Sequence, residues 1–291
     1  MRLAMTKRIT ACIPYYQTRR YVRRAVESLL LQRHRDLTVV VVNDGDPDPP
    51  WRELAHINDR RLVRISLPYN YGPYFATAAV LNASPDEYFL IQDADDWSDE
   101  NRISQLLRVI EHDCSDFAVS RQWWYVEQAD GKHRPSDNRK GGMVDGASSP
   151  ALRYRFPHHG LWRTRSLRML GGYYGGFRVS YDVLLTNLVL LTGKVSYVAA
   201  PLYHYLIRRG SLTTSGTTGL ASPLRAAVWK TISPIYERAY AWQVAMNDCQ
   251  ITSNQLMEWI RQSCRQYVDS TSLAALSDAS ERVAYALRSA R

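Results

Sequence analysis

The chain has 291 residues, of which 45% are hydrophobic and 22% charged, so its composition is that of a folded protein and excludes a largely disordered one. The net charge of +9 favours anionic substrates, nucleic acid or acidic lipid as partners and selects none of them. No apolar run approaches the roughly 20 residues that span a bilayer, and Met1 to Ala11 lacks a long apolar segment before a cleavage site. We therefore expect a cytoplasmic protein with no transmembrane segment, for which peripheral contact with a membrane stays open.

The first half of the chain alternates short apolar runs with segments of helical periodicity. Thr38–Val42 is a continuous β-branched run, which is typical of a strand buried on both faces of a parallel sheet. This alternation predicts a doubly wound α/β fold with a mostly parallel central sheet flanked by helices. The predicted elements are strand Ile9–Ile13, helix Arg20–Gln32, strand Thr38–Val42, strand Leu62–Leu67, helix Pro73–Asn82 and strand Glu87–Gln92.

The first predicted helix is strongly basic. Arg19, Arg20, Arg23 and Arg24 lie at helical spacing around its apolar stripe. We expect these arginines to form the solvated face of an amphipathic helix. A binding face for nucleic acid is the alternative.

Past Glu111 the regular alternation of short apolar runs and helical segments ends. Pro234 falls inside a helical pattern, where its ring predicts a kink or break. The predicted elements are an aromatic strand at Phe117–Val126, a hairpin with a mobile loop at 128–149, helix Tyr181–Leu191, strand Val195–Val198, a flexible loop at 208–219, and helices Arg225–Asn247, Thr252–Val268 and Ser272–Arg288.

The most informative segment is an apolar run that leads into three carboxylates, Asp93, Asp95 and Asp96. Ligands of open α/β sheets bind beyond the carboxyl ends of the strands, and clustered carboxylates suit Mg²⁺ or Mn²⁺, which in turn hold a diphosphate. A solvated acidic turn that caps the following helix is the alternative. The position after a predicted buried strand favours the ligand site.

Three strand ends are predicted to meet at one edge of the sheet. Pro14 to Tyr16 follow the first strand, Asp44 follows the second, and the acidic turn follows the fourth. A tyrosine ring can cover a base, and an aspartate can accept hydrogen bonds from a base or a ribose. Each residue alone also fits a structural role in packing or in a turn, but their joint order predicts a nucleotide pocket.

These segments resemble, in this order, family 2 glycosyltransferases with the GT-A fold, over roughly residues 8 to 215. The resemblance implies a glycosyltransferase domain at 1–220, with a nucleotide-binding half at 8–112 and an acceptor-side half at 113–220, and a C-terminal helical region at 221–291. It also implies inverting transfer of a sugar from a nucleoside diphosphate sugar, first of all a UDP-sugar, to a hydroxyl group. The matching segments are Ile13–Tyr16, Ala25–Gln32, Val42–Gly45, Asn70–Tyr74, Gln92–Trp97, Pro201–Tyr205 and Gly210–Thr213.

The same resemblance implies a role for each residue of the pocket. Tyr16 would stack on the base, Asp44 would contact the base or ribose, and Asp93 the ribose. Asp95 would hold the metal ion, Mn²⁺ or Mg²⁺, against the diphosphate. The residues implied for nucleotide-sugar binding are Pro14, Tyr16, Asp44, Asp93, Ala94 and Asp95, and those implied for the acceptor side are Asp96, His159 and Trp162; Arg208 is added to the nucleotide-sugar side because of its charge.

The family also places a catalytic carboxylate at the start of a helix, after a loop rich in glycine and aromatic residues. Residues 170–177 form such a loop here, and Asp182 is the matching position. Inverting transfer needs a general base that takes the acceptor proton as the acceptor oxygen attacks the anomeric carbon. An acid that interacts with the helix dipole is the alternative role.

Several positions depart from the family pattern, and one of them is Tyr181, which stands where Glu usually precedes the catalytic carboxylate. Thr77 stands where a basic residue is usual, which leaves the sugar and base of the donor open. Leu206 and Arg208 stand where many members carry Arg and a metal-ligating His. Arg208 would instead neutralise the diphosphate directly, which weakens the dependence on metal.

Two alternatives of other kinds stay open at this point: a basic module that binds nucleic acid or another polyanion, and a catalytically altered relative of the glycosyltransferases. The acceptor is equally open among a glycan, a natural product and an anionic polymer such as DNA. The loop at 211–219 is a candidate lid over the donor.

Overall fold

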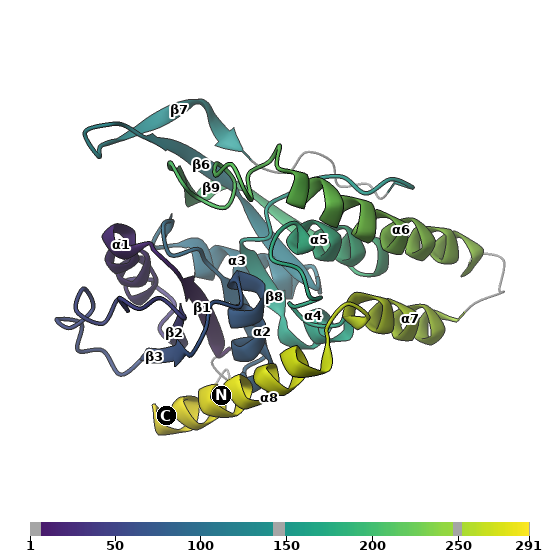
Figure 1. Ribbon diagram of the computed structural model, residues 1–291, viewed down its shortest axis with the longest axis horizontal. Coiled ribbons are helices and arrows are strands. Elements are labelled where there is room, and N and C mark those ends of the chain that lie inside the picture. The colour runs from purple at the N-terminus through teal and green to yellow at the C-terminus, as the bar shows by residue number, and fades with distance from the viewer. Residues whose placement is uncertain (1–6, 142–148, 247–251, 291) are drawn as a thin grey trace.

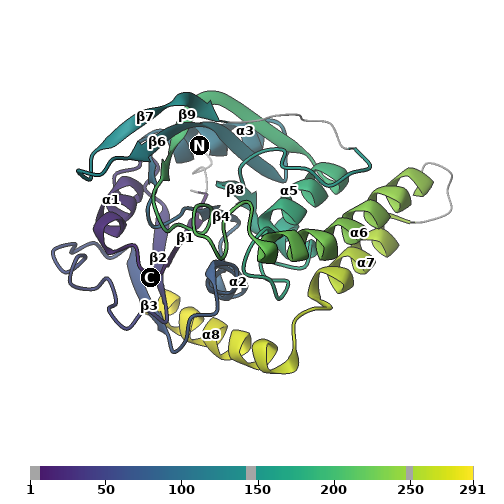
Figure 2. The same cartoon turned by 45° about the horizontal axis from the view of Figure 1, so that its top comes forward.

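The computed structural model describes residues 7–141, 149–246 and 252–290. Over these residues the protein is an α/β fold built on one curled, mixed sheet of nine strands with helices on both faces (Figures 1 and 2). The strands follow the order β3-β2-β1-β4-β8-β6-β9-β5, and β7 pairs with β6 beside this path. The predicted α/β fold class is therefore confirmed.

The N-terminal half supplies the parallel part of the sheet. Its strands are β1 (Ile9–Tyr15), β2 (Leu37–Asp44), β3 (Leu62–Leu67) and β4 (Tyr88–Ile91), and every pairing among them is parallel. Every residue of β4 is buried, and so is every residue of β2 except Thr38. Burial on both faces explains why these strands read as continuous apolar runs.

Two apolar cores lie on opposite faces of this sheet. Val39 and Val41 of β2 pack with α1 (Arg19–Leu30) and α3 (Arg102–His112). Val40 and Val42 point the other way and pack with the core that contains residues of α2 (Pro73–Ala83), α4 (Thr164–Met169) and α5 (Tyr181–Thr192). The alternation follows from the period of two along a strand.

The second half of the sheet is mostly antiparallel. β8 (Gly160–Arg163) joins β4 to β6 (Phe117–Glu127), and β7 (His133–Gly141) forms a hairpin with β6. β9 (Val195–Ile207) runs parallel to β6 and pairs at its far end with β5 (Trp97–Ser98). Because β5 follows the acidic turn directly, its pairing with β9 brings this half of the sheet next to that turn.

Three helices close the chain. α6 (Pro223–Met246) packs on α5, and α7 (Ser253–Arg265) packs on α6. α8 (Ser270–Ser289) lies along α2 and β3, so the C-terminal segment returns to the N-terminal half (Figure 1). Among the described residues, no helix combines the length and the apolar character that crossing a membrane requires.

Several boundaries differ from the predictions. The sequence predicts a kink or a break at Pro234, and α6 continues through this residue, so the helix is not broken there. β9 extends nine residues beyond the predicted end at Val198 because it pairs with β6 and then β5, a tertiary effect. β5 and β8, with 2 and 4 residues, are too short to show a period, and α3 and α4 are likewise absent from the predicted elements. Residues 142–148, which belong to the segment predicted as a hairpin with a mobile loop, and Asn247 lie outside the described residues.

Candidate active site

The carboxyl ends of β1, β2 and β4 lie together, because these strands are parallel neighbours. Tyr16 follows β1 and exposes 39% of its surface, while Pro14 is half-buried. Asp44 at the end of β2 is buried and accepts hydrogen bonds from the backbone N–H groups of Tyr71 (2.9 Å) and Gly72 (2.8 Å). Burial raises the pKa of Asp44, and these two amides oppose the shift. Asp44 thereby holds the turn before α2 against the strand ends.

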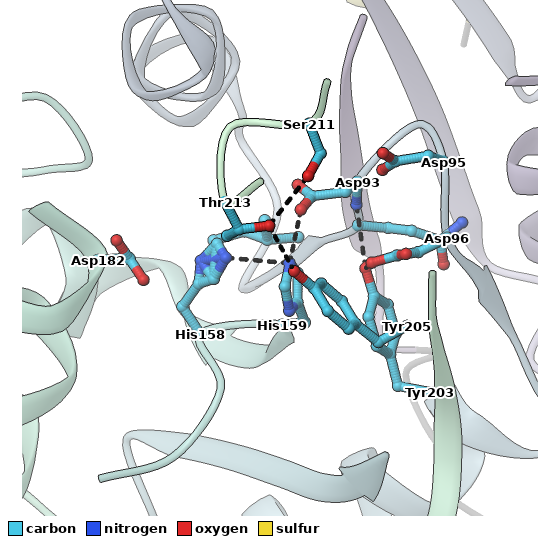
Figure 3. A network of polar contacts seen from close by, with 12 residues as sticks. Asp93, Asp95, Asp96, His158, His159, Asp182, Tyr203, Tyr205, Ser211 and Thr213 are labelled. Carbon is cyan, nitrogen blue, oxygen red and sulfur yellow. Dashed lines mark hydrogen bonds and ion pairs between the residues drawn. The ribbon is translucent and has the colours of Figure 1, made fainter. Parts of the chain in front are cut away.

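The acidic turn after β4 brings three carboxylates together. Ligand oxygens of Asp93, Asp95 and Asp96 all lie within 4.8 Å of one another. Burial is the largest influence on all three and raises the pKa of each carboxyl, and repulsion by another carboxylate raises it further: by Asp182 for Asp93, by Asp93 for Asp95, and by Asp95 and Asp93 for Asp96. Figure 3 shows these side chains side by side at the end of the strand. A site of this kind calls for compensating cations.

Asp96 faces inward, toward β9. Its Oδ2 accepts a hydrogen bond from the Tyr203 hydroxyl at 2.6 Å, and its Oδ1 accepts one from the Leu206 N–H at 2.8 Å. The residue is 1% exposed. The carboxylate therefore ties β9 to the acidic turn, which is a supporting role, one of the two roles that the resemblance implies for Asp96 beside an acceptor-facing one.

Asp95 is paired with Arg208 from the end of β9. Arg208 Nε donates to Asp95 Oδ2 at 2.6 Å, and both side chains are about nine-tenths buried, with exposed fractions of 14% and 13%. The Arg208 charge opposes the upward shift that burial gives the pKa of Asp95. The two predicted donor-side residues therefore do meet, as an ion pair.

The donor set fits a hard divalent cation. Carboxylate oxygens at this spacing are the ligands that Mg²⁺ and Mn²⁺ prefer. Because Asp96 is 1% exposed and is turned toward β9, Asp93 and Asp95 are the residues that would hold the ion. Arg208 occupies one oxygen of Asp95, so an ion and this guanidinium would share or compete for that carboxylate.

Asp93 is oriented by His159, whose protonation the neighbouring side chains decide. Trp124 Nε1 can only donate, and it donates to Gln122 Oε1 at 3.1 Å, so the Gln122 amide group faces His159 Nδ1 at 3.4 Å. His159 therefore accepts at Nδ1 and carries its proton on Nε2, which lies 3.0 Å from Asp93 Oδ2. Burial lowers the pKa of His159 to about 3, so this contact is a hydrogen bond from a neutral imidazole.

His158 continues the chain toward the opposite side of the site. Its Nε2 lies 3.0 Å from His159 Nε2, and its Nδ1 lies 2.8 Å from the Tyr173 hydroxyl. Burial lowers the pKa of His158 to about 4, so it is neutral at neutral pH. The one proton on His159 Nε2 faces both Asp93 Oδ2 and His158 Nε2, each at 3.0 Å, so the two acceptors share it, and His158 donates from Nδ1 to the Tyr173 hydroxyl. The group of Asp93, His158 and His159 is thus a hydrogen-bonded set.

Asp182 lies in the first turn of α5 and is half-buried. Its Oδ1 accepts a short hydrogen bond from the Tyr74 hydroxyl of α2. The preceding residue, Tyr181, leaves no room for a side chain at Gly175, where an added Cβ would lie 2.4 Å from its ring. The close packing of Tyr181 on this glycine-rich loop therefore helps to position the first turn of α5, which carries Asp182. Figure 3 shows Asp182 on one side of the site and Asp93 and Asp95 on the other, with His158 between them.

Trp162 is a core residue, contrary to the predicted acceptor-side role. It is fully buried on β8, and its ring stacks on Phe117 with centroids 4.0 Å apart. Its neighbour Leu161 points into the core on the other face of the sheet. Ala94, predicted on the donor side, is buried as well and packs in the core on the α1 face of the sheet.

Trp162→Ala is expected to destabilise the protein by about 3–5 kcal/mol, because it leaves a large cavity in a packed core. The midpoint and slope of urea unfolding measure this loss. Trp162→Phe keeps an aromatic ring on Phe117 and is expected to lose clearly less. A Trp162→Ala protein of unchanged stability but poor acceptor use would restore the acceptor-side role.

Arg24 is a site residue that the sequence analysis placed on the solvated face of α1. Its guanidinium lies 3.6 Å from the centroid of the Trp97 ring and donates to the Asp95 backbone oxygen at 3.3 Å. Arg24 Nη1 also contacts His133 of β7 at 2.8 Å. No spacing in the sequence signals these contacts, because they join α1 to β5 and to a hairpin far along the chain. Arg20 and Arg23 are exposed, as predicted.

Comparison with known proteins identifies the family of this chain. The chain belongs to glycosyl transferase family 2, whose model matches residues 10–183. Glycosyltransferase GlyA of Streptococcus pneumoniae is 26% identical over 250 residues, which cover 80% of this chain and 35% of GlyA. Glycosyltransferase GlyG of the same organism is 21% identical over 224 residues, which cover 72% of this chain and 73% of GlyG.

A solved structure shares the fold. The crystal structure of S. aureus TarS 1-349 in complex with UDP-GlcNAc matches with a TM-score of 0.59 and 18% identity, and covers 98% of this chain and 92% of that one. The protein is therefore a glycosyltransferase with the GT-A fold, and the predicted family, fold and enzyme class are confirmed.

Proposed function

We propose that the protein transfers a sugar with inversion from a nucleoside diphosphate sugar, first of all a UDP-sugar, to a hydroxyl group, with Asp182 as general base. The observation that carries the proposal is the arrangement of carboxylates, with Asp182 across the site from Asp93 and Asp95 (Figure 3). In-line displacement needs the base and the leaving diphosphate on opposite faces of the sugar. TarS, with the same fold, binds UDP-GlcNAc, which supports a nucleotide-sugar donor.

The donor lies, in this proposal, across the ends of β1, β2 and β4. Tyr16 stacks on the base with its exposed ring, and Asp44 contacts the base or ribose through lone pairs that its backbone partners leave free. Asp93, oriented by His159, accepts from the ribose. The backbone at Pro14 and Ala94 lines the pocket between these side chains.

The diphosphate lies next to the Asp95–Arg208 pair. A divalent ion held by Asp93 and Asp95 would supply positive charge against the departing diphosphate. Arg208 offers a second cation from the chain itself, and a guanidinium suits phosphate oxygens. Two sources of charge fit the departures from the family pattern at Leu206 and Arg208.

The reaction exchanges one bond at the anomeric carbon for another. The acceptor oxygen attacks this carbon, the bond to the diphosphate oxygen breaks, and Asp182 takes the acceptor proton. Tyr74, whose hydroxyl donates to Asp182 Oδ1, leaves Oδ2 to receive that proton. His159, predicted on the acceptor side, acts in this proposal through Asp93.

A thermal-shift screen tests the donor. UDP-sugars or UDP with Mn²⁺, at about 100 times the dissociation constant, are expected to raise the unfolding free energy by about 2.7 kcal/mol, because only the native state binds them. GDP, CDP and dTDP sugars serve as matched controls. A shift with a different nucleotide would correct the base, and no shift with any of them would favour the catalytically altered relative.

A further inference from the structure

Arg225 reaches the Asp182 turn from outside the segment that matches the family. It lies in the first turn of α6, and its Nη1 donates to the Ser180 hydroxyl at 3.1 Å. Ser180 is the residue before α5, is fully buried and has a φ of 62°, a left-handed conformation that L side chains rarely adopt. Such a residue persists only where its surroundings hold it.

The other donors of Arg225 hold a second segment. Nε donates to the carbonyl oxygens of Thr218 (3.1 Å) and Gly219 (3.3 Å), and Nη2 donates to that of Leu212 (3.1 Å). All three carbonyls belong to the loop at 211–219. A guanidinium suits this task, since its five N–H groups point outward in one rigid plane.

This loop lies over the donor side of the site. Figure 3 shows Ser211 and Thr213 beside Asp93 and Tyr205, and Thr213 Oγ1 lies 3.2 Å from the Tyr205 hydroxyl. One side chain thus binds both the turn that carries Asp182 and the loop beside Asp93. The Arg225 charge also opposes the rise that burial gives the pKa of Tyr74, the hydrogen-bond partner of Asp182.

We propose that Arg225 is a positioning residue for the transfer reaction. By joining residues 180–182 to the loop at 211–219, it holds the general base and the donor-side loop in one arrangement. The inference rests on the proposed role of Asp182. It also gives the C-terminal helical region a part in the reaction, because Arg225 comes from α6.

A double-mutant cycle on the purified 291-residue chain tests the link, with UDP-GlcNAc as the donor probe and with kcat and donor KM for the release of UDP as readouts. Arg225→Ala is expected to lower kcat about 10- to 100-fold, because hydrogen bonds from a charged group are lost. Ser180→Ala, which removes one oxygen, is expected to lower kcat less and to leave donor KM unchanged. The double variant is expected to match Arg225→Ala alone, because both changes break the same link. Arg238→Ala, on the exposed side of α6, is the matched control and should retain kcat.

Independent effects would overturn the proposal. Losses that add in the double variant, or an Arg225→Ala effect confined to donor KM, would show that Arg225 only anchors the loop. Ser180→Ala reports by itself even where Arg225→Ala fails to fold. Asp182→Asn is measured beside the cycle. If Asp182→Asn retains transfer, the proposed general base is wrong. If Asp182→Asn loses transfer while Arg225→Ala keeps a normal kcat, only the role of Arg225 is overturned.

Discussion

Asp182→Asn is expected to lower the rate of sugar transfer by about 100- to 10,000-fold, the range that a general base contributes, while nucleotide binding stays unchanged. The amide oxygen of asparagine can still accept the hydrogen bond from Tyr74, so the turn keeps its geometry. Only the capacity to take a proton is lost. Steady-state transfer with the donor found in the thermal-shift screen, together with the nucleotide-induced shift of the variant, measures both parts.

Asp130→Asn is the matched control for this experiment. Asp130 is a surface carboxylate at the tip of the β6–β7 hairpin, with 55% of its side chain exposed. Its variant should retain transfer. An Asp182→Asn protein that transfers at the normal rate would remove Asp182 as the base and leave only its role at the start of α5.

Asp95→Ala is expected to weaken donor binding in the presence of Mn²⁺ by about 10- to 100-fold, because a ligand to the ion is lost. It also leaves Arg208 without its carboxylate partner in a mostly buried position. Removing one partner of a buried pair is costly, at about 3–5 kcal/mol for a fully buried pair, so we expect the ligand-free variant to unfold more easily. Calorimetric titration of the nucleotide with and without Mn²⁺, and urea unfolding, measure the two effects.

Asp95→Asn separates these two effects. The amide oxygen still accepts from Arg208 Nε, so stability should fall less than in Asp95→Ala, while the gain in affinity from Mn²⁺ should be lost in both. Equal affinity of wild type and both variants at saturating Mn²⁺ would show that Asp95 is not a ligand. In that case Arg208 and Arg24 would be the cations that serve the diphosphate.

The sequence by itself determined the parallel half of the fold and the family. Continuous runs such as Thr38–Val42 have to be buried on both faces, and this local requirement leaves few folds. The acidic turn follows an apolar run that composition alone predicts to be a buried strand, so Asp93 and Asp95 could be placed at a sheet edge. Asp182 was predicted from the resemblance to the family, through the glycine-rich loop and the helix start that precede it.

Only the tertiary structure decided which of these groups meet. Trp162 and Asp96 were both predicted on the acceptor side, yet both are buried: Trp162 lies on β8, which pairs with β4, and Asp96 accepts a hydrogen bond from Tyr203. The contacts of Arg24 with Trp97 and of Arg225 with Ser180 join residues that are far apart in sequence. Local spacing carries the period of a helix or strand, but it carries no information on partners that only packing brings together. The cations of this site, and the link from the C-terminal helices to Asp182, are therefore properties of the folded chain.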